Sequence, residues 1–353
     1  MKLKSEINIA GRRVADDAPV YIIGEMACGH QGDLDQALRL VDSTVNAGAD
    51  CIQIQIFEPA ANMAPSSPIY GLLEKLYFTP AQWREIMDYA RQFDIHVSIF
   101  VYDEPSLDLA LDLKPDMLKL NSSELGNPPM LIGAAKSGLP FTLGTGASSI
   151  DEIRRAVKEV LEHGGENLIL MHGVQNFPTP VNTANVRKIR HLRDEFGGLI
   201  IYADHTDAND EIAQWIDLLA IGQGAAMLEK HLIFDRNNKG VDWQAALEPD
   251  EFSKYVTNMR QGWDAIGSYD FQPFTEGDLR YRRFQKKSLV AARDLKAGEI
   301  LRQGDVKYLR VQGENEGIAP YEFEKIALGR QLIRDMEHFE QILPSHLLAD
   351  TRK

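Results

Sequence analysis

Short apolar runs alternate with amphipathic stretches along the first three quarters of the chain. Eight of these runs are long and apolar enough for buried strands, and stretches with helical spacing of apolar positions separate them. The expected strands span residues 20–26, 51–57, 95–102, 116–122, 140–146, 167–173, 198–205 and 225–231. Eight strands that alternate with helices over about 250 residues predict an α/β fold of the (β/α)8 or TIM-barrel type.

Three of the expected helices have recognisable ends. Thr79 precedes Pro80, which is the order of a helix N-cap and a first-turn proline. Ser149 precedes a helix with acidic residues in its first turn, as the helix dipole favours. An earlier amphipathic stretch ends at Gly48, a residue type typical of helix C-termini.

The competing fold is an open, doubly wound parallel sheet. Polar residues recur at the C-terminal ends of the expected strands, and in a barrel these ends converge on one mouth. This recurrence favours the barrel. The polar residues at strand ends are Glu25, Gln53, Gln55, Lys119, Ser122, Thr145, His172, Asp204, His205, Glu229 and His231.

The pattern changes after residue 268, which we take as the end of the barrel domain, residues 1–268. Residues 269–284 are polar and irregular, and we interpret them as a linker. Residues 285–353 contain short apolar runs between glycine turns, which indicates a small β-rich domain.

Composition and charge limit the classes of function and the cellular locations that we expect. The formal net charge of −14 argues against a nucleic-acid-binding surface, although a local basic pocket could still hold an anionic substrate. The two cysteines, Cys28 and Cys51, have no CxxC spacing, so we expect a reducing compartment, the cytoplasm. No secretory signal and no run of about 18 apolar residues is present, so no membrane association is expected.

His205 and His231 end the seventh and eighth expected strands, where two imidazoles could share one divalent ion. The alternative is that each is a hydrogen-bonded residue of the core or rim. Glu25 ends the first strand and is a candidate metal ligand or general base, or else it forms a salt bridge with Lys119 or Lys230.

Lys119 could hold an anion, with the hydroxyls of Ser122 and Ser123 as further donors, or it could pair with Glu124. His172 ends the sixth strand, where it is a third metal ligand, a substrate contact or, as we favour, a structural residue.

Taken together, these residues resemble the sialic acid synthase family, whose members make N-acetylneuraminic, legionaminic and pseudaminic acids. The likeness covers nearly the whole chain. It is carried by the segments GEMACGHQGD, LKLNSSELGNPPML, DHTD, LEKHLIFDR and ALEP, and by KKSLVAARDLKAGEIL at the start of the last domain.

The resemblance implies a TIM barrel followed by a small antifreeze-like (SAF) domain, which covers the barrel mouth of the partner in a domain-swapped homodimer. It implies a metal-dependent condensation of phosphoenolpyruvate with an N-acylated amino sugar, with phosphate as the second product. The ion is expected to be Mn²⁺, with Mg²⁺, Co²⁺ and Zn²⁺ as open alternatives.

The resemblance also implies roles for individual residues. His205 and His231 would hold the metal and Glu25 would be the acid/base group. The residues that would contact substrates are Gln53, Gln55, Lys119, Ser122, Glu124, Gln175, Asp242 and Arg310. Of these, Gln55, Glu124 and Asp242 would contact the sugar, Lys119 and Ser122 would hold phosphoenolpyruvate, and Arg310 would reach across the dimer.

Several positions depart from the family pattern. The family has Lys where this chain has Gln53, Thr near Phe100, Ser at Gly144, Asn at Gln175 and Ser at Ala203. Most of these positions line the phosphoenolpyruvate side in the family. Each lost charge-assisted hydrogen bond removes about 1.5–3 kcal/mol of anion binding.

Three functions therefore stay open at this point. The first is an ulosonic-acid synthase with a remodelled phosphoenolpyruvate pocket. The second is a metal-dependent aldolase-type or lyase-type enzyme that uses another donor, such as pyruvate. The third is a non-catalytic sugar-binding homologue.

Overall fold

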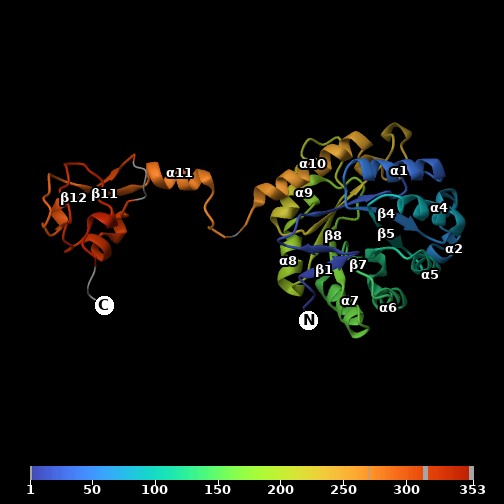
Figure 1. Cartoon of the computed structure of the whole chain (residues 1–353). Coiled ribbons are helices and arrows are strands. Elements are labelled where there is room, and N and C mark those ends of the chain that lie inside the picture. Colours follow the sequence, from blue (N-terminus) through green and yellow to red (C-terminus); the bar gives the residue numbers. More distant parts are fainter. Residues whose placement is uncertain (1, 269, 313–316, 350–353) are drawn as a thin grey trace. The chain divides into compact units, whose positions relative to one another are not determined.

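The structure is a computed structural model that describes residues 2–268, 270–312 and 317–349. The chain divides into two compact units, Met1–Gly267 and Ser268–Lys353 (Figure 1). Each unit has its own hydrophobic core, so each is described separately.

Eight parallel strands of the first unit close into a barrel in the order β10-β3-β4-β5-β6-β7-β8-β9. The strands are β3 (Tyr21–Glu25), β4 (Cys51–Ile56), β5 (His96–Val101), β6 (Met117–Leu120), β7 (Phe141–Gly144), β8 (Leu168–Gly173), β9 (Ile200–Asp204) and β10 (Met227–His231). The TIM barrel predicted from the hydrophobic pattern is thus confirmed, and each strand lies within one of the expected runs.

Helices connect the strands and surround the barrel (Figure 1). They are α1 (Leu34–Asn46), α2 (Pro59–Asn62), α3 (Tyr70–Leu76), α4 (Pro80–Ala90), α5 (Glu104–Leu113), α6 (Pro128–Lys136), α7 (Ile150–Glu162), α8 (Arg187–Phe196), α9 (Ala213–Gly222) and α10 (Pro249–Ile266). Thr79 and Ser149 cap α4 and α7, and each forms a reciprocal capping box with the residue three positions on, Gln82 or Glu152.

The barrel unit has two apolar cores. The larger lies between the strands and the helices, and the smaller fills the barrel interior. A short antiparallel hairpin that the pattern did not reveal, β1 (Glu6–Ile9) with β2 (Arg12–Ala15), adds Ile7, Ile9 and Val14 to the interior core. Burial of each such side chain stabilises the fold by about 1.5–3 kcal/mol.

A buried carboxylate, Asp50, organises the start of β3. Its oxygens accept hydrogen bonds from Arg260 at 2.6 and 2.7 Å, from the backbone N–H of Ile22 at 2.7 Å and from Arg12. Asp50 thereby joins α10 and the hairpin to the barrel wall, because both guanidinium groups share one acceptor.

His30 is a buried imidazole outside the barrel mouth. Its Nδ1 accepts a hydrogen bond from the Gly32 N–H at 3.0 Å, and its ring contacts Phe78, with centroids 4.4 Å apart. The Nε2 atom has no hydrogen-bond partner among the described residues. Burial lowers the pKa of His30 from 6.5 to about 4, so the folded protein keeps this imidazole neutral.

This neutral imidazole predicts a pH dependence of stability. The imidazole of His30 takes up a proton below pH 6.5 in the unfolded chain, but only near pH 4 in the folded chain. Its contribution to the unfolding free energy is therefore complete above pH 6.5 and is lost as the pH falls toward 4. Between pH 7.5 and 5, the wild type should lose about 2 kcal/mol more unfolding free energy than His30→Asn. Urea titrations at both pH values measure this difference, and equal losses in the two proteins would contradict it.

The second unit is small and rich in loops. Helix α11 (Glu276–Gln285) precedes an antiparallel pair, β11 (Lys287–Ala291) and β12 (Val306–Arg310). Much of the stretch interpreted as a linker, residues 269–284, is therefore helical. A separate apolar core packs around Leu289, Leu301 and Phe323. Within the described residues of either unit, no helix is both long and apolar enough to cross a membrane.

Candidate active site

Five of the polar residues at strand ends line one cavity of about 350 Å³ at the barrel mouth: Glu25, Gln55, Lys119, His205 and His231. Side chains of a strand alternate between its two faces, so Glu25 and His231, paired across β3 and β10, both face the interior. The lining residues used below are Glu25, Cys28, Gln55, Phe57, Phe100, Tyr102, Lys119, Asn121, Ser123, Gly144, Met171, Gln175, Phe177, Ala203, His205, His231 and Asp242.

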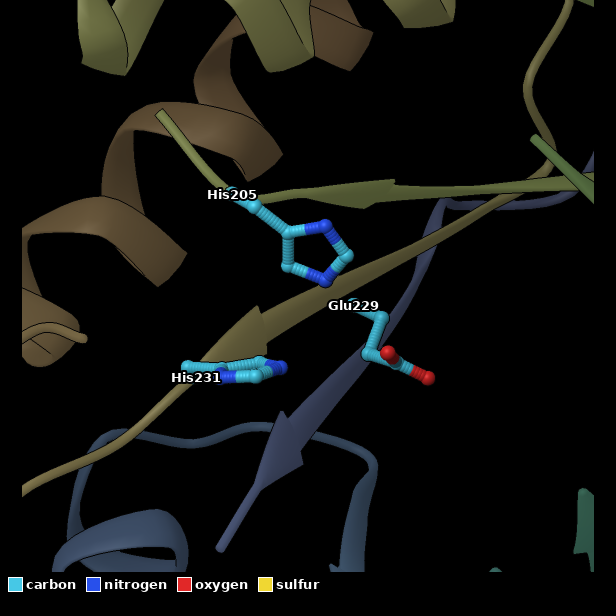
Figure 2. Close-up of side chains that lie close together, drawn as sticks. All are labelled: His205, Glu229 and His231. Carbon is cyan, nitrogen blue, oxygen red and sulfur yellow. The ribbon is translucent and has the colours of Figure 1, made fainter. Parts of the chain in front are cut away.

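His205, Glu229 and His231 form a group that could hold a metal ion. Each offers one ligand atom, and these atoms all lie within 4.8 Å of one another. Figure 2 shows the His205 ring facing the other two side chains from the strand beside theirs. The pair proposed from the sequence, His205 and His231, is thus brought together, with ring centroids 5.0 Å apart.

The donor atoms of this group fit a divalent ion. The Nδ1 of His205 lies 2.8 Å from the carbonyl oxygen of Val174, which can only accept a hydrogen bond. Nδ1 therefore carries the proton, and Nε2 keeps its lone pair for a ligand. Burial lowers the pKa of His205 to about 3 and also lowers that of His231, so both imidazoles are neutral, the form that binds metals.

Lys119 joins the carboxylates at the base of the cavity. Its Nζ donates to Glu25 Oε2 at 2.8 Å and to Glu229 Oε1 at 2.6 Å, and all three side chains are buried. Gln55 donates a hydrogen bond to the other oxygen of Glu25. The salt bridge weighed for Glu25 is therefore present. The one weighed between Lys119 and Glu124 is not, because Lys119 faces the barrel axis.

The network shifts the pKa values of its two carboxyl groups in opposite directions. Burial is the strongest single influence on Glu25 and opposes its ionisation, but the charge of Lys119 and contacts with Glu229 and His231 together hold the pKa of Glu25 below its ordinary value. Burial and the charge of Glu25 raise the pKa of Glu229 well above its ordinary value. Burial would lower the pKa of Lys119, yet the two carboxylates raise it. Two acids with opposite shifts beside one ammonium are typical of an acid/base site.

Aromatic side chains form much of the cavity wall. Phe100 lies under Lys119, with the ammonium 4.2 Å from the ring centroid, and stacks on Tyr102 at 4.2 Å. The ring of Phe177 lies beside those of His205 and His231, with centroid distances of 4.3 and 5.9 Å. The ring of Phe177 shields the histidine pair from water, which strengthens electrostatic interactions there.

The remaining predicted contact residues divide into two groups. Gln175 and Asp242 line the cavity, and burial raises the pKa of Asp242. Gln53 lies below the cavity, fully buried, and Ser122 lines a neighbouring cavity instead. Glu124 is buried and accepts hydrogen bonds from Ser123 and Asn127 at 2.9 and 2.6 Å, outside the cavity lining.

Arg310 lies at the end of β12 in the second unit, where it is exposed. Residues 313–316 of the loop that follows it lie outside the described residues.

Two other polar strand ends serve the fold. The Nε2 of His172 bonds to the carbonyl oxygen of Ala184 at 2.9 Å, in keeping with the structural role that we favoured. Asp204 points away from the mouth and forms a buried ion pair with Lys230, which also contacts Asp217 at 3.3 Å.

At three of the positions that depart from the family pattern, Gly144, Gln53 and Ala203, no side-chain donor faces the cavity. A Cβ at Gly144 would lie 2.7 Å from the backbone nitrogen of Ser122, so a serine would require the following turn to move. Gln53 donates to Glu229 and accepts from Ser98, each at 2.9 Å. Ala203 presents a methyl group to the cavity.

Sequence reasoning did not assign a role to Glu229, Tyr102 or Cys28. A signal existed for Glu229, because it precedes His231 by two residues on one strand and must share its face. The same spacing relates Tyr102 to Phe100. No signal pointed to Cys28, which reaches the cavity from the loop after β3.

Comparison with known proteins agrees with this architecture. Residues 40–270 match the NeuB family model, and residues 286–348 match the SAF domain model. An uncharacterized protein of Methanocaldococcus jannaschii is 30% identical over 98% of this chain and 99% of its own length. The N,N'-diacetyllegionaminic acid synthase of Legionella pneumophila is 29% identical over 93% of this chain and 95% of its own length.

A solved structure is also similar. The crystal structure of N-acetylneuraminic acid synthetase from Leptospira borgpetersenii, in complex with citrate, superposes with a TM-score of 0.73 at 28% identity. The superposed region covers 80% of this chain and 97% of the chain in that structure. The resemblance noted in the sequence is thus confirmed, and the chain belongs to the NeuB family.

Proposed function

We propose that this protein condenses phosphoenolpyruvate with an N-acylated amino sugar of the N-acetylmannosamine type. The products are a nine-carbon 2-ulosonic acid and phosphate. The observation that carries the proposal is the convergence of His205, His231, Glu25 and Asp242 on one cavity, in a chain whose relatives are named as synthases of such acids.

The metal is part of this proposal. His205 and His231 would hold a divalent ion, Mn²⁺ in our expectation, with Mg²⁺, Co²⁺ or Zn²⁺ as alternatives. When bound, the ion supplies Lewis-acid polarisation of the sugar's aldehyde oxygen.

The side chains would divide the remaining work. C3 of phosphoenolpyruvate bonds to C1 of the sugar, whose aldehyde oxygen becomes a hydroxyl; water adds at C2 and phosphate leaves. Glu25, held ionised by Lys119, is suited to take the proton of that water. Lys119, aided by Ser122, Gln53 and Gln175, would hold the donor.

The sugar would contact Gln55, Glu124 and Asp242. Of these, Gln55 and Asp242 line the cavity, whereas Glu124 would need the turn Ser122–Gly126 to move. Arg310 would reach the mouth of a partner subunit in a domain-swapped homodimer. We place the protein in the cytoplasm, and the free thiols of Cys28 and Cys51 agree with a reducing compartment.

A second candidate is an aldolase-type enzyme that uses pyruvate or another 2-oxo acid in place of phosphoenolpyruvate. One observation favours it. Among the described residues that line the cavity, Lys119 is the single lysine or arginine, and its ammonium already donates to two carboxylates. Phosphoenolpyruvate carries two anionic groups, whereas pyruvate carries one, so the smaller donor needs fewer cations.

Phosphate release tests the proposal. The metal-loaded full chain is incubated with phosphoenolpyruvate and a panel of aldoses led by N-acetylmannosamine and 2,4-diacetamido sugars. We expect release that requires both the sugar and the metal. Absence of release across the panel, combined with metal-dependent consumption of pyruvate and an aldose, would refute phosphoenolpyruvate as the donor and support the second candidate.

A further inference from the structure

Gln53 fixes the position of a carboxylate beside the two histidines. Its Nε2 donates to Glu229 Oε2 at 2.9 Å, and its Oε1 accepts the hydroxyl hydrogen of Ser98 at 2.9 Å. The amide nitrogen faces Glu229 because a carboxylate oxygen can only accept, and the hydroxyl of Ser98 then donates to the amide oxygen. All three side chains are buried, so the chain Ser98–Gln53–Glu229 is shielded from water.

Glu229 is held on both oxygens and still has capacity to bind a cation. Oε2 accepts from Gln53 and Oε1 accepts from Lys119 at 2.6 Å. Each carboxylate oxygen has two acceptor sites, so these two donors do not use the full capacity of the group. Figure 2 shows this carboxylate beside His205 and His231, and the three ligand atoms lie within 4.8 Å of one another.

The formal charges of the buried network are unequal. Glu25 and Glu229 contribute two carboxylates, and Lys119 contributes the one cation that bonds to both. Gln53 is neutral, although it lies beside Glu229, where a lysine side chain would supply a second cation. A cation bound next to Glu229 would balance the charge of the second carboxylate.

We propose that Glu229 is a third protein ligand of the divalent ion and that Gln53 is its positioning residue. The centre would then hold its ion by two imidazoles and one carboxylate, in place of two histidines alone. This inference rests on the metal dependence proposed above. It also gives residue 53 a role in the metal centre, in addition to the role beside the donor proposed above.

Metal affinity tests the inference without any substrate. Co²⁺ is titrated into the full chain in competition with a chromophoric chelator, and its visible absorption spectrum reports the ligand set. We expect Glu229→Gln to weaken Co²⁺ binding by at least about 100-fold, and Gln53→Lys by about 10–100-fold, the range for outer-sphere partners of a metal ligand. Both variants should also change the Co²⁺ spectrum.

Gln92→Met is the control, because Gln92 is exposed and is absent from the cavity lining. It should bind Co²⁺ as the wild type does. Thermal unfolding confirms that each variant is folded, and if Glu229→Gln is not, the Gln53→Lys comparison decides. If the folded variants kept the Co²⁺ affinity and spectrum of the wild type, this inference would be overturned, whereas the proposed metal dependence would stand. A wild type that binds no divalent ion would overturn the proposed metal dependence as well.

Discussion

Replacement of His205 by alanine is expected to abolish both metal binding and turnover. The imidazole is the member of the metal group that β9 supplies, and its Nε2 faces His231 and Glu229. Loss of the ion removes several kcal/mol of stabilisation from the charge that develops on the aldehyde oxygen. The expected fall in kcat/KM is therefore at least about 10³-fold, since each 1.36 kcal/mol changes a rate tenfold.

Two measurements check this result, the metal content of the purified variant and its phosphate release. His163→Ala is a suitable control, because His163 lies at the C-terminal end of α7 and is absent from the cavity lining. A His205→Ala protein that is folded and retains full activity would contradict the assignment of the metal centre.

Replacement of Lys230 by methionine is expected to destabilise the barrel by about 3–5 kcal/mol. Lys230 is fully buried and forms ion pairs with Asp204 and Asp217, and its removal leaves two buried carboxylates without a cation. Because protonation would neutralise the orphaned carboxyl groups, the deficit should be larger at neutral pH than in mild acid.

Urea unfolding followed by tryptophan fluorescence measures this loss, because all four tryptophans lie in the barrel unit: Trp83, Trp215, Trp243 and Trp263. Lys254→Met, at an exposed position of α10, is the matched control and should change stability by less than about 0.5 kcal/mol. If both substitutions had the same small effect, Lys230 would not stabilise the barrel wall.

The end of the seventh strand shows what a local sequence pattern can predict and what it cannot. The run 198–205 predicted both a buried strand and a polar end, and β9 has both. The pattern could not tell which polar residues face the mouth. In the structure His205 turns to the cavity, whereas Asp204 faces the surrounding helices, because neighbouring residues of a strand point to opposite faces.

The network around Lys119 shows the opposite case. Its partners, Glu25 and Glu229, lie 94 and 110 positions away in the chain, and no spacing rule links them. The sequence analysis weighed Glu25 and Glu124 as partners of Lys119. Closure of the barrel brings Glu25 and Glu229 to Lys119 and leaves Glu124 outside the network. Likewise, the hairpin β1–β2 is too short for a periodicity signal, and its Ile7 and Ile9 matter only where the barrel interior receives them.

By itself, the sequence determined the barrel, its eight strands, the helix caps at Thr79 and Ser149, and the candidate metal ligands His205 and His231. These follow from periodicity, capping chemistry and short motifs, all of which act over a few neighbouring residues. Only the tertiary structure decided that Gln53 holds Glu229, that Phe100 lies under Lys119 and that Ser122 lines a different cavity. The physical reason is that strand register and barrel closure, and not distance along the chain, set which side chains meet.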